Sequence, residues 1–212
     1  MKSAIKSLFA LVALFVTLVT HSSPLHEISQ SERIQAEKEA LVPWVVDNSH
    51  KQINQEKAKR IIEYIYEYAL ENKLDPLLLL AIAKNESGFR ERVRSSAGAV
   101  GMMQVIPRYH REKIDKRDPM VMKVSIDVGS KIIREYMDKA NNSLRKALNF
   151  YSGGGGKKYY AKVSKTHKQI ATHLIEYSFM NERPIYALHN IDKPIINKIP
   201  NPTYAMVDTN GE

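Results

Sequence analysis

The chain is 212 residues long, which predicts one domain with extensions rather than two full domains. Hydrophobic residues make up 43% of it and charged residues 26%, a composition typical of globular proteins that excludes a disordered or collagen-like chain. There are 32 Lys and Arg against 23 Asp and Glu, giving a net charge of +9. There is no cysteine, which excludes disulfides, thiol catalysis and cysteine-ligated zinc.

Residues 1–22 have the pattern of an export signal. Lys2 and Lys6 precede an apolar run that begins at Leu8 and is shorter than the about 20 residues needed to span a bilayer. We therefore expect a signal peptide cleaved after Ser22, with an uncleaved N-terminal anchor as the alternative, and a periplasmic or secreted protein. Export of a basic chain favours an anionic membrane or cell-wall polymer over nucleic acid, so no nucleic-acid partner is expected.

The rest of the chain divides into three parts. Residues 23–51 are polar and mixed apart from an apolar island at 41–46, and we expect a linker or a weakly docked extension. Residues 52–180 show helical periodicity and should form one mainly α domain of roughly 130 residues, a usual size for a single core. Residues 181–212 contain four prolines that break periodicity, which predicts an irregular tail.

Two helices are predicted in the first part of this domain. From about Gln52 onward, apolar residues fall on one face at a spacing of 3.6. Asp75 and Pro76 then have the residue types favoured at an N-cap and at the first helical position. The helix that they open is apolar at every position of 77–83, so it should be buried, and Gly88 should end it.

The second part of the domain begins with an irregular, basic segment over 87–123. Hydrophobic spacing then predicts three more helices, one from near Ser125, one over 144–151 and one over 165–180. The glycines at 153–156 should end the middle helix. They are not followed by the Lys-Ser/Thr pair of a phosphate-binding loop, so that function is not expected.

Glu86 is the residue most suggestive of chemistry. It lies at the C-terminal end of the helix that is otherwise apolar. Burial and the negative end of the helix dipole both disfavour a carboxylate there, and both raise its pKa. A carboxyl group tuned in this way can act as a general acid near neutral pH. The alternative from position alone is a glutamate that faces solvent where the helix ends.

The segments around Glu86 carry a family signature. Residues 86–89 read Glu-Ser-Gly-Phe, and residues 95–107 contain the turn Gly-Met-Met-Gln. Residues 125–129 and 147–154 supply a Ser-Ile-Asp-Val-Gly helix start and a Phe-Tyr-Ser triplet. Together they resemble the soluble-type lytic transglycosylases, whose motifs are Glu-Ser, Gly-Leu-Met-Gln and Ala-Tyr-Asn. The resemblance covers about residues 55–165.

The resemblance implies a fold and a reaction. The fold is a lysozyme-like helical domain, mainly α, with at most a small β turn or hairpin near the Gly-Met-Met-Gln segment. The reaction is cleavage of the β-1,4 bond between N-acetylmuramic acid (MurNAc) and N-acetylglucosamine (GlcNAc) in peptidoglycan. Glu86 would act first as the acid and then as the base toward the 6-hydroxyl of MurNAc, closing a 1,6-anhydro ring. No metal or other cofactor is implied.

The resemblance also implies a set of substrate-binding residues, which are Ser87, Gly101, Met102, Met103, Gln104, Tyr151 and Ser152. Among them, Tyr151 would orient Glu86. Two residues depart from the family pattern. Met102 replaces leucine, a volume-conserving change, and Ser152 replaces asparagine, whose amide has a longer reach and both donor and acceptor groups. The second change affects one substrate hydrogen bond.

The number of nearby carboxylates favours a transglycosylase over a hydrolase. Most glycosidases use two carboxylates, whereas attack by an internal hydroxyl lets one carboxylate serve twice. Between Glu86 and Gln104 the only other acid is Glu91, in the run Arg-Glu-Arg, where it is expected to pair with arginine. More distant acids could still fold into the cleft, and the candidates are Asp115, Asp118 and Asp127.

Two alternatives to a transglycosylase stay open. One is a goose-type-like lysozyme on the same fold, and the other is an inactive wall-binding assembly protein. The expected partner is the peptidoglycan glycan strand, and a monomer is expected. Such a domain would serve wall turnover, phage entry or an envelope-spanning secretion or conjugation apparatus.

Several other features have ordinary structural explanations. The spacing of His167 and His173 places them on different helix faces, which does not indicate zinc. Tyr159 and Tyr160 could stack on sugars, but tyrosines at the edge of a helical core are commoner. The basic residues near the motifs either form a solvated face or meet the peptide carboxylates of the polymer, and the sequence favours neither.

Overall fold

The computed structural model describes residues 29–181, which excludes the predicted signal at 1–22 and nearly all of the predicted tail at 181–212. The chain divides into two compact units, residues 1–34 and residues 35–212, and the described part of the first unit is 29–34. The elements in chain order are α2 (Gln30–Asp47), α3 (Gln55–Glu71), α4 (Pro76–Ser87), η1 (Pro107–Tyr109), α5 (Arg111–Ile114), α6 (Met122–Lys139), α7 (Leu144–Tyr151) and α8 (Gly156–Met180). None of the helices within 29–181 is long and apolar enough to cross a membrane.

The prediction of a mainly α fold is confirmed. β structure in the described residues is limited to two isolated antiparallel bridges, which join Val100 to Arg94 and to Val105. These bridges flank the Gly101–Gln104 turn, so the expected small β turn lies where the sequence indicated.

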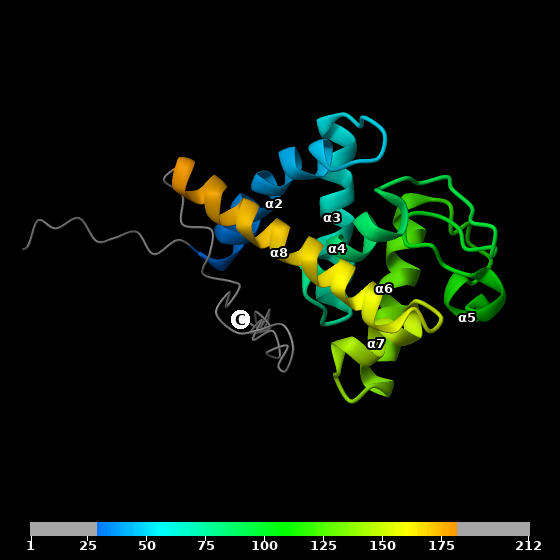
Figure 1. Ribbon diagram of the computed structural model, residues 1–212. Helices are drawn as coiled ribbons and strands as arrows, with labels where there is room; N and C mark the ends of the chain where they lie inside the picture. Colours follow the sequence, from blue (N-terminus) through cyan, green and yellow to red (C-terminus); the bar gives the residue numbers. More distant parts are fainter. Residues whose placement is uncertain (1–28, 182–212) are drawn as a thin grey trace, which may run out of the picture. The chain divides into compact units, whose positions relative to one another are not determined.

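Helix α4 is buried at the centre of the second unit, where it packs against α3 and α8 (Figure 1). Its start and end follow the predicted signals. The Asp75 side chain accepts a hydrogen bond from Leu77 N at 2.8 Å, and Pro76 occupies the first helical position. Gly88 ends the helix in the left-handed conformation with φ of 61°, and a Cβ there would lie 2.7 Å from the Cβ of His50. Every residue over 76–83 is buried, as the unbroken apolar run predicted.

Helix α2 was not foreseen, because its segment was expected to be a linker or a weakly docked extension. The apolar island instead forms the C-terminal half of the helix, where Leu41 and Val45 are completely buried. The Trp44 ring packs edge-on against Phe89, with the ring centroids 6.3 Å apart. Pro43 lies inside the helix, and proline disfavours a helix interior, which explains why the sequence pattern favoured a linker.

Helix α8 begins nine residues before the predicted start, at Gly156 rather than Lys165. Its buried residues continue the helical spacing upstream through Val163 to Tyr160. The sequence interpretation missed this first part, residues 156–164, because three lysines lie among its few apolar positions. The added turns carry residues that contact the end of α4.

Candidate active site

Glu86 lies in the last turn of α4 and is half-buried. Burial raises the pKa of its carboxyl group above the ordinary value of 4.5. A hydrogen bond from the Tyr159 hydroxyl to Oε1 and the positive charge of Lys162 act in the opposite direction and offset part of this rise. Glu86 therefore stays protonated to a higher pH than an ordinary glutamate does, and one of its oxygens is held in place.

Two stacked tyrosines lie beside this carboxyl group. The rings of Tyr151 and Tyr159 are 6.5 Å apart at an interplanar angle of 20°. Burial, together with the negative charge of Glu86, raises the pKa of both phenols, so both stay hydrogen-bond donors at neutral pH. The Tyr151 hydroxyl donates to the backbone carbonyl of Met103 at 2.6 Å.

The tyrosine that bonds to Glu86 is Tyr159, whereas the sequence interpretation expected Tyr151 to orient this carboxyl group. Tyr151 instead connects α7 to the Gly101–Gln104 turn. Tyr159 had been assigned to the edge of the core, and the early start of α8 is what brings it to α4. A helix predicted to start at Gly156 would have placed Tyr160 on the buried face with Val163. Tyr159, the preceding residue, would then have pointed about 100° away from Tyr160 around the helix.

The Gly101–Gln104 turn is held rigidly. Gly101 has φ of +76°, and a Cβ there would lie 2.0 Å from the carbonyl oxygen of Pro119, so only glycine fits. Val100 and Val105 exchange backbone hydrogen bonds of 2.8 and 3.0 Å across the turn. The Gln104 amide nitrogen donates to the Gly101 carbonyl at 2.9 Å, which leaves the amide oxygen as an acceptor. Gly101 therefore shapes the turn rather than presenting a group to a ligand.

Met102 and Met103 do not line a cleft with their side chains, contrary to the expectation from the family pattern. Both are 0% exposed. A Cβ at Gly129 of α6 would lie 2.7 Å from the Met103 side chain, so the glycine lets the turn approach the helix closely. The backbone N–H of Met103 donates to Ser125 Oγ at 3.0 Å. These methionines fix the turn against α6.

The two predicted site serines are bonded to their own helices. Ser87 is buried, and its hydroxyl lies 3.4 Å from the carbonyl oxygen of Ala83. Ser152 is half-buried at the end of α7 and donates to the Asn149 carbonyl at 3.2 Å. Neither hydroxyl is bonded to Glu86. The structure brings Glu86, Tyr151, Tyr159 and the backbone of Met103 together, whereas the two serine hydroxyls bond to backbone carbonyls of their own helices.

Glu91 has a cationic partner, although not the expected arginine. Its carboxylate lies 3.5 Å from the ammonium group of Lys57 and accepts a hydrogen bond from Met122 N at 3.0 Å. This places the carboxylate at the start of α6, where the helix dipole favours negative charge. Glu91 therefore has a structural role there.

Two of the three more distant acids are engaged elsewhere, and the third, Asp115, is exposed just after α5. Asp127 is buried between Arg117 and Lys131, at 2.6 and 2.7 Å. Asp118 accepts a hydrogen bond from Met120 N at 2.8 Å. No acid in the described chain contributes to the pKa shift of Glu86. The site over residues 29–181 therefore has a single acid at its centre, and no group of three His, Asp or Glu in that range could hold a metal ion.

Comparison with known proteins places this geometry in a family. The model of the Transglycosylase SLT domain matches residues 63–174, more than half of the chain, and the match includes Glu86, the Gly101–Gln104 turn and Tyr159.

Two solved structures are similar to the chain. An inactive mutant of the lytic transglycosylase Slt from Pseudomonas aeruginosa has 18% identity and a TM-score of 0.43, over 64% of this chain and 25% of that one. The 70 kDa soluble lytic transglycosylase of Escherichia coli has 16% identity and a TM-score of 0.44, over 74% of this chain and 32% of that one. The chain thus spans about a quarter to a third of the length of these proteins. On the match of the family model, the chain belongs to the Transglycosylase SLT domain family.

Proposed function

We propose that this chain is a peptidoglycan lytic transglycosylase that cleaves the MurNAc–GlcNAc β-1,4 bond and leaves a 1,6-anhydro-MurNAc end. The observation that carries the proposal is the carboxyl group of Glu86. Burial raises its pKa, a tyrosine holds one of its oxygens, and it lies inside the segment that matches the family. Those are the properties that a general acid at neutral pH requires.

The first step is proton transfer. Oε1 accepts the hydrogen bond from Tyr159, so the proton of the neutral carboxyl group resides on Oε2. Glu86 gives this proton to the glycosidic oxygen as the bond between that oxygen and C1 of MurNAc breaks. The GlcNAc hydroxyl leaves, and the substrate's own N-acetyl oxygen stabilises the positive charge at C1.

The second step uses the same carboxyl group as a base. The Glu86 carboxylate takes the proton of the MurNAc 6-hydroxyl while the oxygen of that hydroxyl bonds to C1. This closes the anhydro ring and restores the neutral acid. No water is consumed, so no second carboxylate is needed to activate one. The ion pairs that occupy Glu91 and Asp127 support this route over that of a lysozyme.

The sugar-binding roles are proposed for two polar groups of the family motifs. The free amide oxygen of Gln104 and the hydroxyl of Ser152 are the groups through which we propose that the chain holds the substrate. The proposed setting is the bacterial envelope, reached through a signal at 1–22, with the chain acting as a monomer on glycan strands. The domain assignment of 52–180 stays part of this proposal.

Digestion of purified peptidoglycan tests the proposal. The full chain and its Glu86→Gln variant are incubated with intact sacculi (isolated peptidoglycan layers), and the released muropeptides are identified by mass spectrometry. We expect anhydro-ended products that disappear in the variant. Products heavier by one water would make the chain a hydrolase, and silence from both proteins with wall binding retained would favour the assembly protein.

A further inference from the structure

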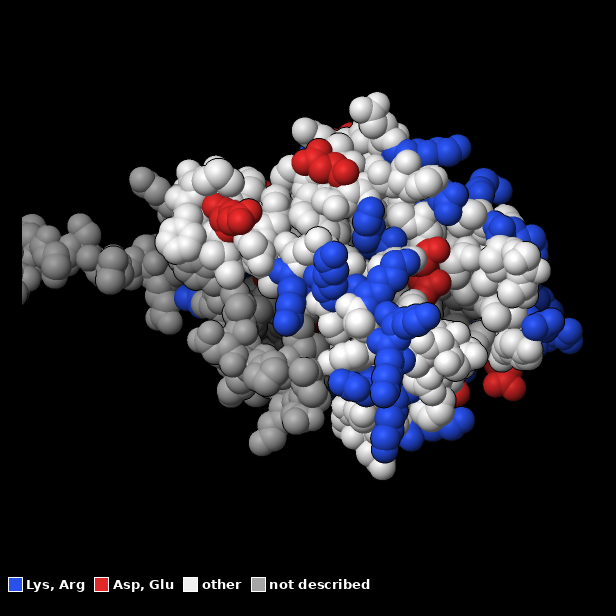
Figure 2. Space-filling view, in the orientation of Figure 1, with Lys and Arg blue, Asp and Glu red and all other residues white. Residues whose placement is uncertain are grey.

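A row of lysines lies along the exposed side of α8. We name Lys158, Lys162, Lys165 and Lys168 the α8 lysine stripe; their spacing of four, three and three residues spreads them over about a third of the helix circumference, and all are exposed. None of them has an ion-pair partner among the residues that the structure describes. Figure 2 shows Lys and Arg gathered over the first half of α8 and over α7.

This arrangement of charges is unfavourable for the helix itself. Lys158 lies in the first turn, where the helix dipole disfavours a cation. Like charges three and four residues apart repel each other along the whole stripe. The first acidic residue of α8 is Glu176, two turns beyond Lys168, so no acid within the helix offsets the repulsion. An anion bound along the stripe would remove this unfavourable energy.

One end of the stripe reaches the proposed catalytic acid. Tyr159, the neighbour of Lys158, donates its hydroxyl hydrogen to Glu86. The ammonium group of Lys162 lies 3.5 Å from the carbonyl oxygen of Asn85, the residue before Glu86. A polymer cleaved at Glu86 would therefore pass the first lysines of the stripe.

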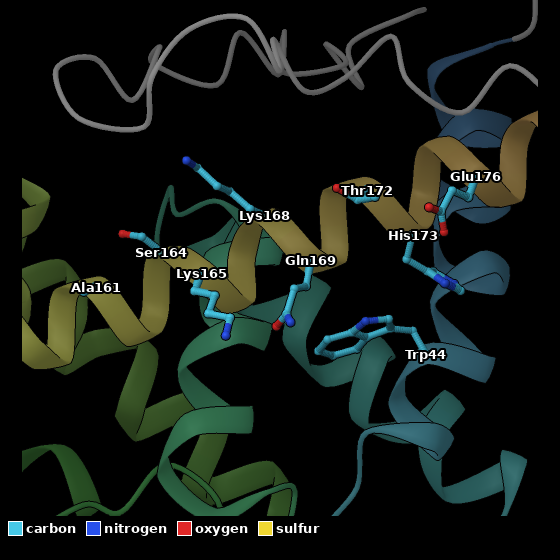
Figure 3. A pocket seen from close by; sticks show the side chains of 9 residues that line it. All are labelled: Trp44, Ala161, Ser164, Lys165, Lys168, Gln169, Thr172, His173 and Glu176. Atoms are coloured by element: carbon cyan, nitrogen blue, oxygen red, sulfur yellow. The ribbon is translucent and has the colours of Figure 1, made fainter.

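The other end of the stripe opens into a groove of about 640 Å³. We name it the Trp44 groove. Its wall combines apolar surface from Trp44 and Ala161 with the ammonium groups of Lys165 and Lys168, and the carboxylate of Glu176 also lines it. In Figure 3, Lys165 lies on the same side of α8 as the Trp44 indole, whereas Lys168 extends from the other side. The groove falls in the range of about 300–1,000 Å³ found for sites that hold small ligands.

We propose that the α8 lysine stripe binds the carboxylates of the peptides attached to the glycan strand, and that the Trp44 groove receives the end of such a peptide. This inference rests on the proposed function, because the peptides are brought to the stripe by the glycan that is cut at Glu86. Peptides of the wall combine free carboxylates with small apolar side chains, and the stripe and groove offer ammonium groups beside an apolar wall.

A membrane surface fits the same charges less well. Helices that bind membranes expose large apolar side chains next to their lysines. The exposed residues beside the stripe are small or polar, namely Ala161, Gln169 and Thr172, and the large exposed apolar residues of α8, Phe179 and Met180, lie at its far end, more than two turns beyond Lys168. Trp44 is only 6% exposed, so its ring cannot insert into a bilayer.

The test measures binding without cleavage. The full chain carrying Glu86→Gln is sedimented with intact sacculi, alone or with Lys158→Gln, Lys165→Gln and Lys168→Gln combined. Lys162 is left unchanged because it lies beside the acid. The matched control replaces three exposed lysines elsewhere, Lys51, Lys59 and Lys116, and so changes the net charge equally. We expect about tenfold weaker binding for the stripe variant, since three exposed ion pairs are lost, and no change for the control.

The substrate is also altered to identify the ligand. Sacculi whose carboxylates have been amidated chemically keep their peptides and lose the charge. We expect the chain with all its stripe lysines to bind amidated sacculi about tenfold more weakly than intact sacculi. The stripe variant should bind amidated and intact sacculi equally. Replacement of the same three lysines by arginine should restore binding to intact sacculi, and this shows that loss in the glutamine variant is not misfolding.

Three results would overturn the inference. The first is that the stripe and control variants bind intact sacculi equally well. The second is that amidation weakens binding of the stripe variant as much as it weakens binding of the chain with all its lysines. The third is that the stripe substitutions weaken binding only to vesicles of anionic lipid. The outcome is separate from that of the proposed reaction. Carboxylate-dependent binding without anhydro products would contradict the proposed reaction and support peptide binding by the stripe. Anhydro products without carboxylate-dependent binding would support the reaction and contradict the role of the stripe.

Discussion

The two ends of α4 carry carboxyl groups that the structure uses in opposite ways. Asp75, at the N-terminus, accepts one hydrogen bond from Leu77 N at 2.8 Å and contacts Nε2 of His167 at 2.7 Å. The positive end of the helix dipole favours its charged form. Glu86, at the C-terminus, is desolvated, lies at the negative end of the dipole and accepts one hydrogen bond from Tyr159. Position on one helix therefore separates a group that stabilises the fold from a group suited to proton transfer.

The largest expected effect comes from replacing the acid. Glu86→Gln should lower the rate of anhydro-product formation by about 10²–10⁴-fold, the usual contribution of general acid–base catalysis. The rate of product release from purified sacculi measures it. Asp75→Asn is the matched change at the other end of α4 and should leave the rate close to that of the unchanged chain. Equal losses in both variants would contradict the division of roles.

The hydrogen bond from Tyr159 should set the pH range of the reaction. It favours the charged form of Glu86, so Tyr159→Phe should raise the pKa of the acid further. The high-pH limb of the rate profile, where the acid is lost, should then move to higher pH.

Tyr151→Phe is the control for that shift. It removes the bond to the Met103 carbonyl instead, which should cost about 1 kcal/mol of unfolding free energy. Rate profiles and denaturant unfolding of both variants separate the two roles. If Tyr151→Phe moved the high-pH limb of the rate profile further than Tyr159→Phe, Tyr151 would be the residue that orients Glu86, as the family pattern implied.

The N-cap should matter for stability alone. Asp75→Ala removes the acceptor for Leu77 N and should cost about 1 kcal/mol of unfolding free energy, as the loss of an N-cap usually does. Asp75→Asn keeps an acceptor oxygen and should cost less. Denaturant unfolding of the two variants measures the difference, and an equal cost would show that the contact with His167 outweighs the cap.

The smallest effect concerns stability as a function of pH. Because the pKa of Glu86 is raised in the folded chain, its contribution to stability is complete at pH values below 4.5 and is lost as pH rises through the folded pKa. Glu86→Gln cannot ionise, so the variant should become more stable relative to the unchanged chain as pH rises. Thermal unfolding at pH 4 and pH 8 tests this, and a constant difference would contradict a raised pKa.

The sequence was sufficient for features that depend on local residue types. Asp75, Pro76 and Gly88 each have one favoured place at a helix end, so the bounds of α4 were predictable. The position of Glu86 followed from those bounds.

Features that depend on packing between distant segments were not predictable. The helix around Pro43 forms because the apolar island that surrounds it is buried, which outweighs the local preference. The helical spacing separates Tyr160, which is buried with Val163, from Tyr159, but only the packing of α8 against α4 brings the Tyr159 hydroxyl to Glu86. The burial of Met103 likewise depends on the space left by Gly129 on another helix.

Direct titration of Glu86 tests the account most plainly. The carboxyl carbons of the glutamates are labelled with ¹³C, and the Glu86 resonance is assigned by its absence in Glu86→Gln. We predict that this carboxyl group titrates above 4.5, and that the loss of anhydro-product formation at high pH follows the same curve. A carboxyl group that titrates at or below 4.5, or a rate that does not follow it, would contradict Glu86 as the acid.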